Sequence, residues 1–379
     1  MTYRKTVILA VAVALVMLAA LPALAEEPIP EPNSHNEALL ELIPELGALP
    51  GPDWLITGYR FFYDVLYYDK DDNVTDTATL VFDIAGIGGG HVLTNCYMAD
   101  FDDNGVLTDF SQYSFMVDYP GLGEVWISPE IFKGEDAPGI KSGVFELVEM
   151  EEADEAEKAT EAWYTQIDSP DGMSVTELYY GKEDGLLLLL EGYSYDEAGN
   201  YEGGSTVKFH KYEEYTAPWM DYGLTGLEEG ISILYDMDVT WEDGSDASGV
   251  MTFVAEQNFS SWAYMIQYLD SEELGSSEGD RIISEMSTDG LMLWMPTEAF
   301  KYIDDGDIYF EEEEVGTIVK AGGIIEVAGF GATRLLHFKD GFFMADAYFS
   351  LEDGYMVKYY QYPTDQKPFE ILLTLKEIK

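Results

Sequence analysis

The sequence predicts a mainly β protein made of two tandem, similar antiparallel domains that follow a signal peptide. Apolar and polar residues alternate with the period of two that is typical of half-buried strands, and turn signals recur about every ten residues. A stretch around a tryptophan also occurs twice, as Val125–Phe132 (VWISPEIF) and Leu293–Phe300 (LWMPTEAF). We expect each domain to be a curved meander sheet or half-barrel, with a β-sandwich as the alternative.

The repeated tryptophan stretch has a simple physical interpretation. In both copies an apolar residue precedes the tryptophan, a proline follows within three residues, and an acidic residue stands two before a phenylalanine. The tryptophan and its aliphatic neighbours bury a large apolar area, and the proline removes a ladder donor. The stretch therefore predicts a buried strand end that turns sharply.

A β-hairpin precedes each copy of the tryptophan stretch. Aromatic residues over Tyr59–Tyr68 and the following Thr77–Ile84 predict the first hairpin. Strict alternation over Ile231–Glu242, then a turn and Val250–Ala255, predicts the second.

A third pair of segments follows the tryptophan stretches. Thr176–Leu186 resembles Thr333–Phe342, and each contains a charged turn with Asp-Gly, at Asp184 and at Asp340. Three landmarks in the same order predict that the chain arose by duplication.

The expected domain order has four parts. Residues 1–25 are expected to be a signal peptide, because Arg4 and Lys5 precede the apolar run Val7–Ala20 and a small-x-small site ends at Ala25. An uncleaved membrane anchor is the alternative. An acidic, proline-rich linker with a short helix is expected over 26–50, the first β repeat over 51–216 and the second over 217–379. The protein is thus expected to be secreted or to belong to the cell envelope.

The formal net charge of −54 limits the possible partners. Such a charge excludes nucleic acid and an anionic membrane surface as electrostatic partners. The 47% of hydrophobic and 14% of aromatic residues are enough for a packed core, so the acidic residues are expected on the surface of a folded protein. A saline habitat and loosely bound cations both remain explanations for them, and the oligomeric state stays open.

No candidate catalytic, cofactor-binding or metal site survives inspection of the motifs. Gly275–Gly279 fits G-x-S-x-G but is expected to lie in a polar loop, without the strand and helix that a nucleophile elbow needs. Gly86–His91 lacks the last glycine of a dinucleotide fingerprint and predicts a bend or bulge. Asp100–Asp109 resembles a calcium loop but has Ser111 where the last acidic ligand belongs. The four histidines are His35, His91, His210 and His337, and no two of them have the spacing of zinc ligands.

Further predictions concern the cysteine, two asparagines, one acidic segment and cofactors. Cys96 is the chain's one cysteine, so no intrachain disulfide is possible, and its strand-like surroundings predict a buried, inert thiol. Asn73 and Asn258 begin glycosylation sequons, which favours exposure. Glu149–Glu161 fits either a helix or a long hairpin tip. No cofactor is expected.

The function expected from these observations is a non-catalytic, extracytoplasmic binding or carrier protein with an apolar or aromatic ligand on a concave face. The aromatic residues of the first hairpin motivate this hypothesis, namely Tyr59, Phe61, Tyr63, Tyr67 and Tyr68. A surface-displayed structural or interaction protein without a small-molecule ligand is the alternative, and a carboxylate-based hydrolase is the third. A large pocket lined by Phe, Tyr and Met would favour the carrier, and solid cores would favour the interaction protein.

Overall fold

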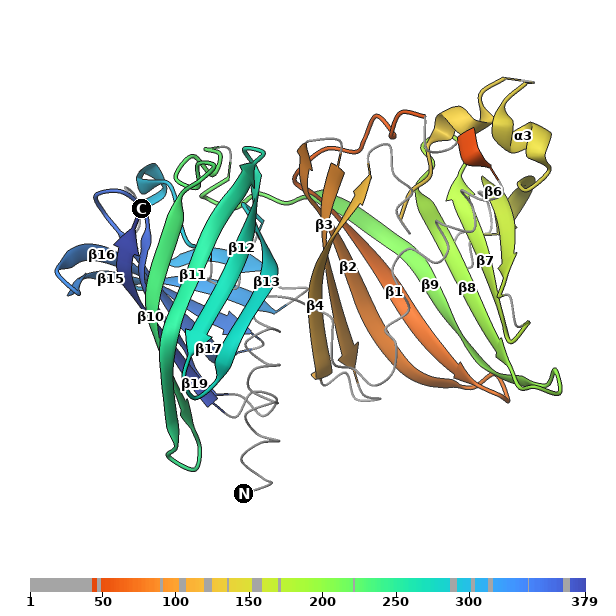
Figure 1. Ribbon diagram of the computed structural model, residues 1–379. Coiled ribbons are helices and arrows are strands. Elements are labelled where there is room, and N and C mark those ends of the chain that lie inside the picture. The colour runs from red at the N-terminus through yellow and green to blue at the C-terminus, as the bar shows by residue number, and fades with distance from the viewer. Residues whose placement is uncertain are drawn as a thin grey trace. The chain divides into compact units, whose positions relative to one another are not determined.

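The computed structural model shows two compact units that meet in sequence between Tyr215 and Thr216. We call Glu27–Tyr215 the N-terminal unit and Thr216–Lys379 the C-terminal unit, and each is described by itself (Figure 1). The expected signal peptide and most of the expected linker lie outside the described residues. The structure describes residues 43–45, 49–88, 91–101, 107–118, 125–134, 136–151, 159–169, 172–220, 222–286, 292–300, 304–312, 316–339, 341–363 and 369–379.

The N-terminal unit is one antiparallel sheet of nine strands in the order β4-β3-β2-β1-β9-β8-β7-β6-β5. A 3-10 helix η2 (Pro129–Phe132) and a short helix α3 (Pro138–Ser142) lie between β4 and β5. The strands are β1 (Tyr59–Asp69), β2 (Val74–Gly88), β3 (His91–Phe101), β4 (Leu107–Asp118), β5 (Glu146–Glu151), β6 (Ala159–Asp168), β7 (Ser174–Gly181), β8 (Leu187–Tyr195) and β9 (Tyr201–Glu214).

The C-terminal unit is one antiparallel sheet of ten strands in the order β13-β12-β11-β10-β19-β18-β17-β16-β15-β14. A 3-10 helix η3 (Thr297–Phe300) lies between β13 and β14. The strands are β10 (Ser232–Trp241), β11 (Asp246–Asn258), β12 (Trp262–Ser271), β13 (Gly275–Ser284), β14 (Ile308–Glu312), β15 (Thr317–Val327), β16 (Phe330–Lys339), β17 (Phe342–Ser350), β18 (Met356–Gln361) and β19 (Phe369–Ile378).

The two sheets are built in the same order. In each, four consecutive strands form a meander, a 3-10 helix follows, and the remaining strands run back so that the last strand pairs with the first. Each unit is therefore a single curved sheet (Figure 1), which confirms the predicted antiparallel β fold and rules out the sandwich alternative. None of the described helices is long and apolar enough to cross a membrane.

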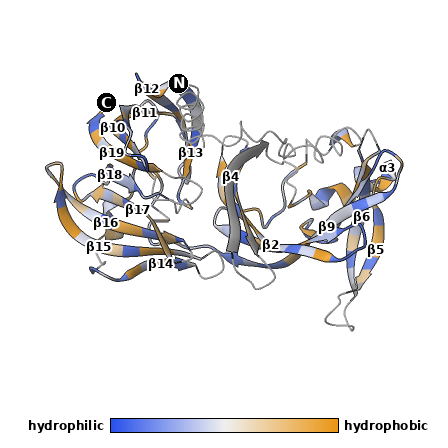
Figure 2. Ribbon diagram, turned by 90° about the horizontal axis from the view of Figure 1, so that it is seen from below, coloured by the Kyte–Doolittle hydropathy of each residue, from blue (hydrophilic) through white to orange (hydrophobic). Residues whose placement is uncertain are grey.

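The period-two pattern explains which side chains form the cores. Along β10, Ile233, Tyr235, Met237 and Val239 are all buried, whereas the residues between them face the other side of the sheet. Figure 2 shows the same alternation of hydrophobic and hydrophilic residues along other strands. Burial of the apolar set on one face fixes the register of each strand, because a shift by one residue would expose it.

The tryptophan stretch is bridged to the second half of each sheet. Trp126 forms an isolated bridge with Leu186, and Trp294 forms one with Tyr355. After the tryptophan the chain enters a 3-10 helix, η2 or η3, so the predicted sharp turn is confirmed, although Trp126 lies outside the nine strands. The proline supports this turn because it cannot donate to a ladder.

The bridges identify the true counterpart of the Asp184 turn. The Ile127 amide donates to the Gly185 carbonyl at 2.8 Å, and the Met295 amide donates to the Gly354 carbonyl at 2.9 Å. Asp184 therefore corresponds to Asp353, in the turn between β17 and β18. The predicted match with Asp340 is wrong, because that residue, itself outside the described residues, falls between β16 and β17.

The alternatives for Glu149–Glu161 are resolved at both flanks of the segment. Glu146–Glu151 is β5 and pairs with β6 from Glu151 opposite Ala159 to Glu146 opposite Tyr164. The described flanks are thus the two arms of a hairpin, and the helix alternative is wrong for them.

Candidate functional site

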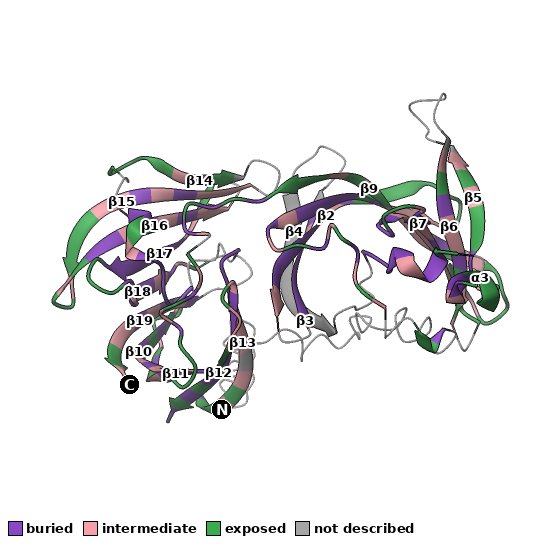
Figure 3. Ribbon diagram, turned by 90° about the horizontal axis from the view of Figure 1, so that it is seen from above, coloured by how far each residue is buried: buried purple, intermediate pink, exposed green. Residues whose placement is uncertain are grey.

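The inner face of the N-terminal sheet is filled by the chain's own side chains. Trp126 and Ile131 are fully buried and join Phe61 and Tyr63 of β1 in one core cluster. The Tyr63 hydroxyl donates to the Leu187 carbonyl at 3.2 Å. Figure 3 shows the buried helix η2 inside the curve of the strands. Phe61 and Tyr63, which were expected to line a ligand cavity, are therefore core residues.

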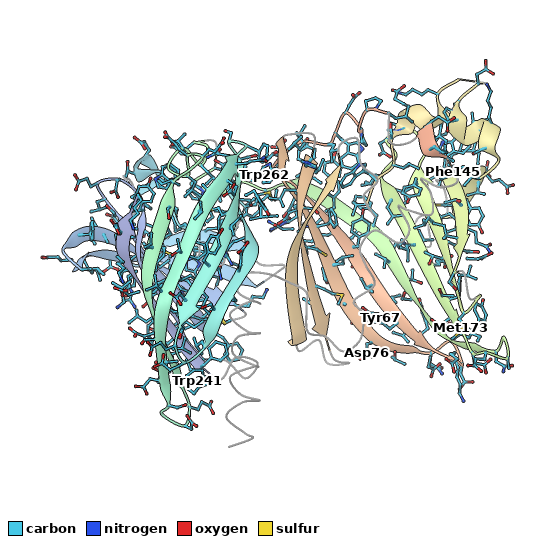
Figure 4. The ribbon with its side chains drawn as sticks, viewed as in Figure 1. Tyr67, Asp76, Phe145, Met173, Trp241 and Trp262 are labelled. Atoms are coloured by element: carbon cyan, nitrogen blue, oxygen red, sulfur yellow. The ribbon has the colours of Figure 1, made fainter. Side chains whose placement is uncertain are left out.

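The inner face of the C-terminal sheet is closed in a similar way around Tyr235. Its ring packs edge-on against Phe253 at 5.9 Å, and its hydroxyl donates to the Met356 carbonyl at 2.9 Å. This bond corresponds to the one from Tyr63 to Leu187. Trp241 and Trp262 mark opposite ends of this sheet (Figure 4).

One hollow of about 290 Å³ lies in the N-terminal unit, and none of its lining residues belongs to the core cluster. Tyr67 is one of its lining residues, and Figure 4 shows Tyr67 and Met173 near one end of the sheet and Phe145 near the opposite end. Most of its lining is small or polar, from Tyr67, Ser174, Val175, Thr176, Gly192, Tyr193, Ser194, Gly204 and Ser205. Another, of about 250 Å³ in the C-terminal unit, is lined by Ser248, Gly249, Asp270, Ser271, Glu272 and Glu273. Neither is the pocket of Phe, Tyr and Met that a carrier would need.

The outer face of β6, β7 and β8 carries a group of tyrosines around two carboxylates. We call Tyr164, Glu177, Tyr179, Glu191 and Tyr193 the tyrosine–glutamate cluster. Glu177 and Glu191 are direct partners in the ladder of β7 and β8, so their side chains lie on the same face. That face is the outer one, because Leu178, next to Glu177, belongs to the core cluster.

Tyrosine hydroxyls donate to both carboxylates of this cluster. The Tyr164 hydroxyl lies 3.0 Å from Glu177 Oε1, and the Tyr179 hydroxyl lies 3.3 Å from Oε2. Glu191 accepts from Tyr193 and Tyr179. All five side chains are half-buried. Among the described residues, no basic side chain forms an ion pair with Glu177 or Glu191.

The unbalanced charge of the cluster appears in its pKa values. Burial, and then the Glu177 carboxylate, raise the pKa of Glu191. Burial and the Glu191 carboxylate raise the pKa of Tyr193 to about 12. Both shifts have the same cause, since a half-buried site that holds two like charges disfavours any further negative charge.

At the equivalent place in the C-terminal unit, an arginine side chain pairs with the carboxylate. We call Arg334, Asp346, Tyr348, Tyr360 and Tyr362 the Asp346 cluster. Arg334 Nη2 donates to Asp346 Oδ2 at 2.6 Å, and the hydroxyls of Tyr348 and Tyr362 lie 3.1 Å and 3.3 Å from the same oxygen. The Arg334 guanidinium lies over the Tyr348 ring, at 5.8 Å from its centroid.

The strand registers align the two clusters residue by residue. Counting from the matched Asp-Gly turns places Glu177 at the position of Asp346 and Tyr179 at that of Tyr348. Across the ladders, Tyr179 pairs with Tyr164, whereas Tyr348 pairs with Arg334. On the other side, Glu177 pairs with Glu191, whereas Asp346 pairs with Tyr360. In the N-terminal unit a tyrosine thus replaces the arginine, and a second carboxylate replaces a tyrosine.

The structure places the motifs considered in the sequence in ordinary sheet positions. Gly275–Gly279 begins β13, so the expected polar loop is wrong, and no helix follows that could form a nucleophile elbow. Gly88 pairs with His91 at the turn between β2 and β3, beyond a bulge at Ile84 and Gly86, which fits the predicted bend. The centre of the calcium-like segment, residues 102–106, lies outside the described residues.

The remaining predicted residues are dispersed. Cys96 is a free, buried thiol within the core cluster, as predicted. No group of His, Cys, Asp and Glu that could hold a metal ion occurs in the part of the chain that the structure describes. Asn73 is exposed in a turn, but the Asn258 amide donates to the carbonyls of Leu224 and Leu227, so the expected exposure of this sequon is wrong.

Comparisons with known proteins do not identify a family. No family model and no curated protein matches the chain. Its fold is similar to that of a Pseudomonas aeruginosa MucA/MucB complex structure, with 9% identity over 91% of this chain and 94% of the other and a TM-score of 0.22. A DUF3598 family protein from Nostoc punctiforme matches with 7% identity over 85% of this chain and 96% of its own, at a TM-score of 0.19. Likenesses at these TM-scores support no conclusion about function.

Proposed function

We propose that this protein is an extracytoplasmic, non-catalytic interaction protein that binds its partner on exposed surfaces of its two β units. The single observation that supports this proposal is the filling of both inner faces by the chain's own side chains, around Tyr63 and Tyr235. A carrier of an apolar ligand would need a concave apolar pocket, and the two hollows described above are small and largely polar. The proposal therefore follows the second sequence-based hypothesis in place of the carrier.

Extracytoplasmic location enters the proposal from the sequence. The charged start, apolar run and small-residue site of residues 1–25 are the features of an export signal. The absence of a catalytic role is supported by the dispersal of the histidines, the buried position of Cys96 and the sheet position of Gly275–Gly279.

Native mass spectrometry of the exported, purified protein tests this function. We expect the mass of the folded protein to equal the mass of the polypeptide measured after denaturation. A lipid or other apolar molecule that is bound in a fixed ratio, and that is lost on denaturation, would contradict the proposal and restore the carrier hypothesis.

A further inference from the structure

The two outer-face clusters differ in one respect that points to a ligand. In the C-terminal unit, the carboxylate at this position binds the guanidinium of Arg334. In the N-terminal unit the corresponding carboxylate, Glu177, keeps its tyrosines and gains Glu191 as a cross-strand neighbour, but has Tyr164 where the arginine would be. We propose that the tyrosine–glutamate cluster binds the guanidinium of an arginine side chain that a partner protein presents.

The chemistry of the cluster suits this group. A planar guanidinium can donate to two carboxylates at once and can lie against aromatic rings. Tyr164 and Tyr179 supply such rings, with centroids 5.1 Å apart beside Glu177. The Asp346 cluster shows the same arrangement within one chain, because Arg334 meets both the carboxylate and the ring of Tyr348.

A metal ion suits the cluster less well than a guanidinium. The cluster has two carboxylates, and no group of three or more potential ligands is found among the described residues. Calcium normally takes six to eight oxygen ligands. The high negative charge of the whole chain adds a long-range attraction for any cationic surface, and this speeds encounter with a basic partner.

This inference rests on the proposed function, since it names the chemistry of the partner. The test is a ligand-detected NMR titration of the purified full chain with acetyl-Gly-Arg-Gly-amide. Acetyl-Gly-citrulline-Gly-amide serves as the neutral control of the same shape. We expect the arginine peptide to bind with a dissociation constant in the millimolar range or below and the citrulline peptide to bind at least about tenfold more weakly.

Two double variants separate the cluster from the general charge. Glu177→Gln with Glu191→Gln should weaken binding of the arginine peptide at least about tenfold. Glu197→Gln with Glu202→Gln removes the same charge from exposed positions near the tip of the β8–β9 hairpin and should leave binding unchanged. Equal weakening in both variants would overturn the proposal, because it would show attraction by net charge alone.

The variant Tyr164→Arg copies the C-terminal unit into the N-terminal one. Its guanidinium should occupy the cluster, abolish binding of the arginine peptide and raise the melting temperature. Unchanged binding in a folded Tyr164→Arg protein would overturn the proposal. Displacement of the arginine peptide by calcium chloride, but not by sodium chloride at matched ionic strength, would also overturn the proposal. Native mass spectrometry decides the proposed function separately, so the two failures are distinguishable.

Discussion

Each unit contains an arginine–aspartate pair, but the two pairs lie at different places in equivalent sheets. In the N-terminal unit Arg60 of β1 pairs with Asp83 of β2, with two contacts of 2.5 and 2.7 Å. The same two positions in the C-terminal unit are Ser232 and Val254. In that unit the arginine is instead Arg334, on the outer face of β16.

The environments of the two pairs differ as much as their positions. Arg60 and Asp83 are 1% and 0% exposed, and the guanidinium carbon lies 4.3 Å from the centre of the Tyr215 ring. Arg334 is 32% exposed and its partner Asp346 only 3%. One sheet plan thus accepts an arginine at either place. Its absence leaves carboxylates without a cation only at the outer-face position of Tyr164, because Ser232 and Val254 carry no charge.

The largest expected effect concerns the buried pair. Arg60→Met leaves the Asp83 carboxylate buried without its main donor and should destabilise the N-terminal unit by about 3–5 kcal/mol. Arg334→Met should cost only about 1–2 kcal/mol, because tyrosine hydroxyls still donate to Asp346 and the arginine is partly solvated. Urea denaturation measures both. The double variant Arg60→Met with Asp83→Leu should regain most of the loss, and equal costs for the two single variants would break the comparison.

The shared Asp-Gly turn gives the next effect and sharpens the equivalence of the units. A Cβ at Gly185 would lie 1.9 Å from the Ile127 carbonyl oxygen, and one at Gly354 would lie 2.0 Å from that of Met295. Both glycines also have positive φ, at 71° and 81°. Alanine at either position should cost roughly 2–4 kcal/mol.

Gly199 provides the matched control for the turn glycines. Its φ is 81°, and a Cβ there would meet nothing within 4 Å, so Gly199→Ala should cost only about 1 kcal/mol. Thermal denaturation followed by calorimetry compares the three variants. A mild effect at Gly354 with a severe one at Gly185 would show that the two turns are not equivalent.

A smaller effect depends on pH and is confined to the N-terminal unit. The pKa of Glu191 is raised by folding, so the folded state holds this proton more firmly, and the stability that it provides is lost as pH rises through the raised pKa. Glu191→Gln should therefore raise the melting temperature at pH 7 by about 1–3 °C and have little effect near pH 4. Tyr360→Phe at the corresponding place should show no such dependence between these two pH values. Equal gains at both pH values would contradict the assigned cause.

The smallest difference between the units is expected in their response to salt. Screening of the acidic surface by sodium chloride should stabilise both, since the Debye length falls from about 30 Å at 0.01 M to about 8 Å at 0.15 M. Melting curves in sodium, potassium and calcium chloride at matched ionic strength should coincide, and chelation should change nothing. A steep response to millimolar calcium would indicate a bound metal and would revive the segment Asp100–Asp109.

The sheets were more predictable from the sequence than the clusters on them. Alternation over Ile231–Glu242 found β10 almost to the residue, because one face of that strand is buried throughout. The match of Asp184 to Asp340 failed because the chain has several Asp-Gly turns that look alike locally. Only the bridges from Trp126 and Trp294 distinguish them, and such bridges depend on long-range register.

The tyrosine–glutamate cluster shows the same limit. The sequence places Glu177 and Tyr179 on the face opposite Leu178, which alternation alone could have revealed. It does not show that Glu191 lies across from Glu177, since this depends on the bulge between Tyr179 and Tyr180. With 73 acidic residues in the chain, no pair of them stands out before the strands are aligned.

The buried Cys96 gives the N-terminal unit a built-in probe of its own opening. The thiol is 1% exposed within the core cluster, and the chain has no other cysteine. A thiol reagent can therefore react only when the core around Cys96 opens, at a rate set by the population of that open state. Native-state labelling would report the opening free energy of one unit without interference from the other, and the Arg60 and Gly185 variants could be compared in the folded protein without denaturant.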